Sequence, residues 1–156
     1  MRTVSGLLFL AFSLFATPSV ADELVATPQK AATLSLTYEQ SDVPQIADKQ
    51  PNVNVVLTVT EYTPSVDGAV MAYVEAKDHR SHIVATTTFS MFPNSAFKAG
   101  DNENTRRFIL SINRWELIDT MKRTLTITVN LIPVVKGRSV DGAMMRFAPA
   151  EVHRNF

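Results

Sequence analysis

The sequence contains no cysteine. Disulfide bridges, thiolate metal ligands and a cysteine nucleophile are therefore excluded, and so is the lipid-modified cysteine of an anchored lipoprotein. An exported domain of this composition is held together by packing alone. A bacterial envelope suits such a bridge-free domain better than animal or plant secretion does.

The sequence also lacks an excess of charge of either sign. Lysine and arginine together number 15, and aspartate and glutamate together number 15. A nucleic-acid-binding protein needs a basic face, and steering toward an anionic membrane needs a net positive charge. We therefore expect no nucleic-acid partner.

Histidine is scarce, with three residues in the chain. His79 and His82 lie three residues apart in a charged connection, where two imidazoles can reach one metal ion, although protein metal sites usually have three or four ligands. Met144 and Met145 are adjacent, and thioethers bind Cu(I). Two interpretations stay open: a copper site that uses these four residues, or solvent-facing histidines beside core-filling methionines.

No motif for catalysis is present. The chain has no glycine-flanked serine elbow, and neither Ser65 nor Ser139 has a histidine close to it in sequence. We therefore predict no catalytic residues and no cofactor, with copper as the alternative.

The first residues have the pattern of an export signal. Arg2 provides a positive charge, an apolar run follows from Leu7 to Phe15, and Ser19-Val20-Ala21 provides small residues for signal peptidase. The run is too short to span a membrane. Residues 1–21 are thus predicted to be a cleaved signal peptide, which places the protein in the periplasm or outside the cell with no membrane span after cleavage.

Strand patterns dominate the rest of the chain. Apolar and polar residues alternate with period two, which is typical of half-buried strands. Seven strands are predicted, at residues 33–38, 53–62, 69–76, 83–92, 106–112, 124–132 and 143–152.

One segment has a different period. Trp115, Ile118 and Met121 are spaced like one face of a helix, and Asn113 can cap it. The predicted fold is therefore an all-β antiparallel sandwich with one short helix at residues 113–122 between two late strands. Its domain spans residues 33–153, after a flexible lead-in at residues 22–32.

Two aromatic residues lie where the long connection after the predicted strand 83–92 begins. They are Phe92 and Phe97, and Pro93 directly follows Phe92. Two interpretations stay open: the aromatic rings fold back and cap the sandwich, or they form a protruding patch that binds a partner.

The order of these segments resembles the β-sandwich domain that follows the catalytic domain in tyrosinases and polyphenol oxidases, the type-3 copper proteins. Four segments carry the resemblance. Residues 68–78 look like that family's strand of the "KFDVYVN" type, and residues 83–94 look like its "FAGSF…P" strand. Residues 106–121 look like its strand followed by a short helix, and residues 124–152 look like its proline-ended strand, basic turn and final strand. Three histidines cannot build the dicopper centre of that family's catalytic domain, so the resemblance implies the accessory domain alone.

The resemblance implies an accessory role. In that family the domain covers the entrance to the copper site and keeps the enzyme latent. We therefore expect a non-enzymatic exported domain that binds a protein partner, such as a separately encoded type-3 copper oxidase that it shields or assists. The alternatives are a periplasmic copper carrier and a generic binding or structural module of the envelope.

Overall fold

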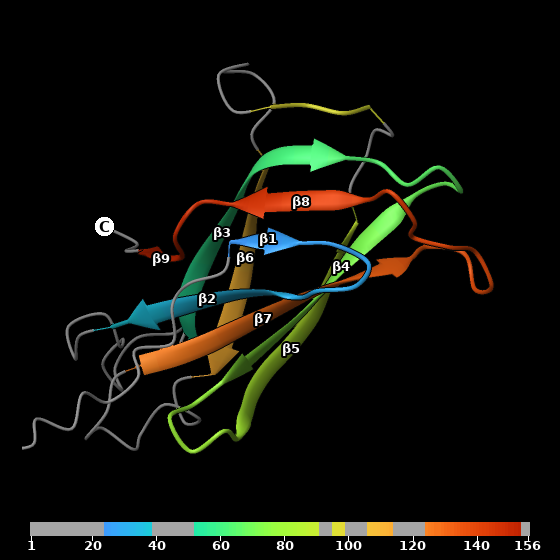
Figure 1. Ribbon diagram of the computed structural model, residues 1–156. Helices are drawn as coiled ribbons and strands as arrows, with labels where there is room; N and C mark the ends of the chain where they lie inside the picture. Colours follow the sequence, from blue (N-terminus) through green and yellow to red (C-terminus); the bar gives the residue numbers. More distant parts are fainter. Residues whose placement is uncertain (1–23, 39–51, 91–94, 99–105, 114–123, 154–156) are drawn as a thin grey trace, which may run out of the picture.

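The two-residue alternation of apolar and polar side chains builds a β-sandwich (Figure 1). The computed structural model describes residues 24–38, 52–90, 95–98, 106–113 and 124–153. The strands in this part of the chain are β1 Val25–Ala26, β2 Ala32–Thr37, β3 Asn52–Thr63, β4 Val70–Lys77, β5 Ile83–Ser90, β6 Arg106–Asn113, β7 Thr124–Pro133, β8 Met144–Phe147 and β9 Glu151–His153.

The strands form two antiparallel sheets. One sheet has the order β1-β8-β3-β6, with β9 also paired to β3, and is called the β3 sheet below. The other has the order β2-β7-β4-β5 and is called the β7 sheet. The all-β antiparallel sandwich predicted from the sequence is confirmed.

The core lies between the sheets and consists of the inward side chains of the central strands. In β3 the buried side chains on this face begin at Val53 and end at Val59, and in β7 they begin at Leu125 and end at Leu131. β4 contributes every second residue from Val70 onward. β-branched and aliphatic residues suit these positions because they pack well on a pleated surface.

One side of the sandwich is closed by an aromatic pair. Phe89 on β5 and Phe108 on β6 stack with ring centroids 4.6 Å apart, and both pack against the core. β5 and β6 are the last strands of their respective sheets. The pair therefore covers the core where the two sheets end.

Two bulges change which residues face inward. In β3 the register shifts between Val59 and Glu61, so that Tyr62, three residues after Val59, is also buried. Where β4 and β5 pair, Val84 is an extra residue on β5, so that Ile83 lies opposite Lys77. The sequence pattern predicts an inward Ile83, but this side chain is 54% exposed because the bulge turns it to the outer face.

The first and last strands of the structure differ from the strands predicted from the sequence. β1 lies in the predicted lead-in of residues 22–32 and pairs with β8, and Ala26 is fully buried. Strand pairing therefore starts at Val25, before the predicted residue 33. The predicted last strand divides into β8 and β9, because residues 148–150 leave the ladder around Pro149.

Two predictions fall on other parts of the chain. Asn113, the predicted helix cap, is the last residue of β6, and residues 114–122 of the predicted helix lie outside the described residues. The predicted signal peptide, residues 1–21, also lies outside them. Within the described ranges, no helix has the length and apolar character needed to cross a membrane.

Candidate functional site

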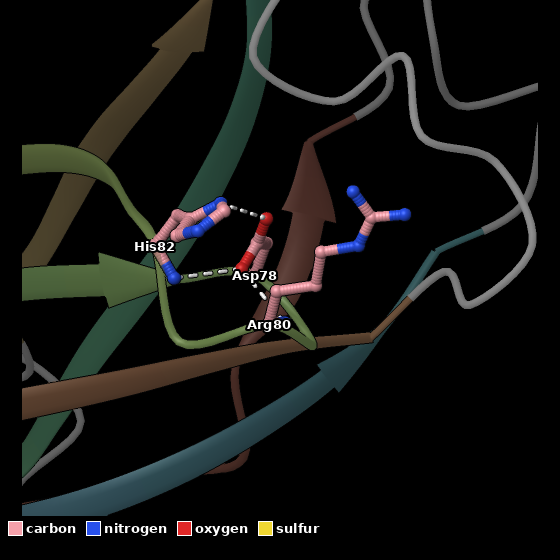
Figure 2. A network of polar contacts seen from close by, with 3 residues as sticks. All are labelled: Asp78, Arg80 and His82. Atoms are coloured by element: carbon pink, nitrogen blue, oxygen red, sulfur yellow. Dashed lines mark hydrogen bonds and ion pairs between the residues drawn. The ribbon is translucent and has the colours of Figure 1, made fainter.

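The two histidines of the predicted metal site lie in the turn between β4 and β5. Asp78 organises this turn, because its Oδ1 accepts hydrogen bonds from the backbone N–H groups of Arg80 and His82, both at 2.8 Å (Figure 2). The Nδ1 atom of His82 lies 3.5 Å from the other carboxylate oxygen, Oδ2. Ser81 adopts a left-handed conformation with φ of 65°, which the turn requires.

The same contacts set the charge of Asp78. Partial desolvation by itself raises the pKa of the carboxyl, but the two N–H donors of His82 and Arg80 and the nearby histidine charges outweigh it, so the pKa lies below its ordinary value. In Figure 2 the guanidinium of Arg80 extends away from the carboxylate, so Arg80 acts here through its backbone. The turn is thus a self-contained polar network in which His82 already has a partner.

The two methionines of the predicted copper site lie elsewhere. Met145 is fully buried in the core, whereas Met144 is half-buried and faces the other way, as adjacent strand residues do. Met144 pairs with Thr63 at the end of β3, close to where β4 begins, and the histidines follow the other end of β4. Eight residues of strand separate these ends by roughly 25 Å.

The four predicted copper ligands are therefore not brought together. In the part of the chain that the structure describes, no group of three or more histidine or carboxylate side chains is arranged to hold a metal ion. His153, the remaining histidine, lies on β9 in the β3 sheet.

Of the residues predicted at the start of the long connection, the structure describes Phe97. Phe97 folds back onto β3: its backbone exchanges two hydrogen bonds with Tyr62, at 2.9 and 3.0 Å, and its ring lies 6.0 Å from the tyrosine ring. Phe97 is only 8% exposed and belongs to the core. It therefore caps the sandwich in this structure and does not protrude. Phe92 and Pro93 lie outside the described residues.

Exposed apolar side chains lie instead on two loops that are hydrogen-bonded to each other. Val66 is 82% exposed in the β3–β4 turn, and Val134 and Val135, in the loop after β7, are 36% and 60% exposed. Among the described residues the other large exposed apolar side chains are Ile83 and Ile109, which lie on β5 and β6. The β3–β4 turn and the loop of residues 134–142 are called the loop end below.

Hydrogen bonds join the two parts of the loop end. Val66 N–H donates to the carbonyl of Asp141 at 3.2 Å, and Ser65 Oγ donates to the carbonyl of Ser139 at 3.2 Å. Val134 N–H donates to the carbonyl of Ala69 at 3.0 Å. The valines are thus held on a backbone that is already ordered.

Local turn chemistry adds to this order. Ser65 Oγ accepts from Asp67 N–H, and Ser139 Oγ accepts from Asp141 N–H, which are serine turns of the same kind. Gly142 has φ of 76°, a conformation that a residue with a Cβ rarely adopts. These sequence choices favour the turn conformations that the two loops adopt.

Charged residues are also exposed on the two loops of the loop end. Lys136, Arg138 and Asp141 are exposed on the longer loop, and Asp67 is exposed on the β3–β4 turn. Exposed apolar side chains and charges of both signs therefore share the two loops of the loop end.

Sequence reasoning missed the loop end. Its signal is present, because Val66, Val134 and Val135 are apolar residues inside turn segments, where polar residues are the norm. The sequence does not show, however, that these two turns meet.

Comparison of the chain with protein-family models, with curated proteins and with solved structures gives no match.

Proposed function

We propose that this protein is a non-enzymatic binding domain that acts by protein contact through its loop end. The observation that carries the proposal is the exposure of three valines on two loops that are hydrogen-bonded to each other. Burying such side chains in an interface is favourable, by about 25 cal/mol for each Å² of apolar surface. Because the loops are already ordered, little conformational entropy is lost on binding.

The sequence resemblance suggests the class of partner. A domain similar to the tyrosinase C-terminal β-sandwich would shield or assist a type-3 copper oxidase in the periplasm or outside the cell. The proposal moves the contact from Phe97, which is buried, to the loop end. The alternative of a copper carrier receives less support, because the predicted histidine and methionine ligands lie at opposite ends of β4.

A pull-down with the tagged full chain tests the proposal. The variant is Val66→Ser combined with Val135→Ser, which removes the apolar contact without touching the core. The matched control is Ile109→Ser, since Ile109 is 52% exposed on the outer face of the β3 sheet. Exposed substitutions of this kind change the free energy of unfolding by about 0.5 kcal/mol or less, so all three proteins should fold alike.

The expected result is one stoichiometric partner that the wild type and Ile109→Ser retain and the double variant loses. A copper oxidase as that partner would support the accessory role. Retention of the partner by the double variant, or equal loss in the control, would remove the loop end as the contact site.

A further inference from the structure

The outer face of the β7 sheet carries hydroxyl groups on its outermost strands and on β7. The inward residues alternate with these positions and are buried or packed against the core, so the intervening side chains point away from it. The outward hydroxyl residues are Thr33, Ser35 and Thr37 on β2, Thr124, Thr126 and Thr128 on β7, and Thr86, Thr88 and Ser90 on β5. The remaining strand, β4, supplies an aromatic ring.

The strand register places that ring among polar side chains. Tyr73 on β4 lies directly opposite Asn130 on β7 and Thr88 on β5. The next row along the sheet contains Glu75, with Thr128 and Thr86 as its neighbours. Directly opposite residues on one face have Cβ atoms about 5 Å apart, so these side chains form a continuous surface.

The outer faces of the two sheets differ in how many of their polar side chains are hydrogen-bonded to one another. On the β3 sheet, Ser111 Oγ donates to Asn54 Oδ1 at 2.8 Å, and Arg146 Nε donates to Glu61 Oε2 at 2.9 Å. Within the described ranges, no comparable side-chain hydrogen bond engages Tyr73, Asn130, Thr88 or Thr128. Their donors and acceptors are therefore available to a ligand.

The face has no net charge around Tyr73. Glu75 and Lys77 form an ion pair with 2.8 Å between Oε1 and Nζ, and the carboxylate and ammonium cancel. Among the residues that the structure describes, an anionic or cationic ligand would find no unpaired opposite charge beside Tyr73. A neutral ligand rich in hydroxyl groups matches both the charge and the hydrogen-bonding groups of the surface.

We propose that this face binds a neutral polysaccharide, with Tyr73 stacking on a sugar ring and Asn130, Thr88 and Thr128 forming hydrogen bonds to its hydroxyl groups. Tyrosine suits this role because it offers a rigid, amphipathic contact area with little side-chain entropy to lose. The site is a face of one sheet, separate from the loop end, so it does not depend on the proposed protein contact.

The test uses the purified full chain in affinity electrophoresis, with dextran, mannan, xylan or hydroxyethyl cellulose in the gel and alginate as the anionic comparison. The wild type should be retarded by at least one of the neutral polysaccharides and not by alginate. Tyr73→Ala should bind about tenfold more weakly, as expected when an aromatic anchor is removed. Thr88→Val combined with Thr128→Val keeps the β-branched shape and should also weaken binding.

The matched control is Thr58→Val, which makes the same change on the outer face of the β3 sheet and should bind like the wild type. The threonine variants keep the experiment decisive if Tyr73→Ala fails to fold, which circular dichroism would show. Retardation by none of the four neutral polysaccharides, stronger retardation by alginate, or unchanged binding in the folded variants would overturn the proposal. Recovery of a protein partner that depends on Tyr73 but not on the valines of the loop end would overturn it as well.

Discussion

Replacing Phe97 by alanine separates a structural role from a binding role for this residue. The Phe97 side chain is 8% exposed, its ring contacts Tyr62, and its backbone is paired with β3. Truncating a buried phenylalanine to alanine costs about 3–5 kcal/mol through lost apolar burial and the cavity left behind. Because Phe97 lies at the margin of the core, we expect a value near the lower limit.

That loss should be large against the total stability. Domains of this size unfold with about 5–15 kcal/mol, and about 3 kcal/mol lowers the Tm by roughly 10 °C. Urea unfolding followed by circular dichroism measures the change, with Ile109→Ala as the exposed control, which should differ from the wild type by about 0.5 kcal/mol or less. If Phe97→Ala keeps the wild-type Tm, Phe97 is not a core residue, and the hypothesis that it contacts a partner regains its place.

Two further predictions concern Tyr62 and Asp78. The Tyr62 hydroxyl is buried without a hydrogen-bond partner in the described part of the chain. Tyr62→Phe should therefore raise the free energy of unfolding at neutral pH by about 1 kcal/mol in urea titrations. A decrease of similar size would show that the hydroxyl has a partner. Burial also raises the pKa of Tyr62, so the wild type should lose stability as the pH rises above the ordinary range of tyrosine, and the variant should lack that component. Because the pKa of Asp78 is lowered in the folded state, its carboxylate stabilises the turn above the ordinary carboxyl range, and this contribution disappears as the pH falls through the lowered pKa. Thermal unfolding between neutral and acidic pH should therefore show a gap between the wild type and Asp78→Asn that closes in acid, and a gap independent of pH would contradict this role of Asp78.

The sequence alone determined the strands and the fold class. Seven predicted strands correspond to β2–β7 and to the β8–β9 segment, because alternation with period two is a local property of the chain. The inward set in β7, from Leu125 to Leu131, could be read directly from the sequence for the same reason. Stop signals were equally local, since β7 ends at Pro133.

Only the tertiary structure decided which residues meet. The bulges that bury Tyr62 and expose Ile83 arise from pairing with a neighbouring strand, and β1 exists because β8 lies beside it. The same holds for the sites: Phe97 is buried because it pairs with β3, and Val66 meets the loop after β7 across more than seventy residues of sequence. The row of Asn130, Tyr73 and Thr88 likewise depends on the register of three strands. Periodicity records how each residue faces its own strand, whereas register and loop contacts depend on partners distant in sequence, which no local pattern specifies.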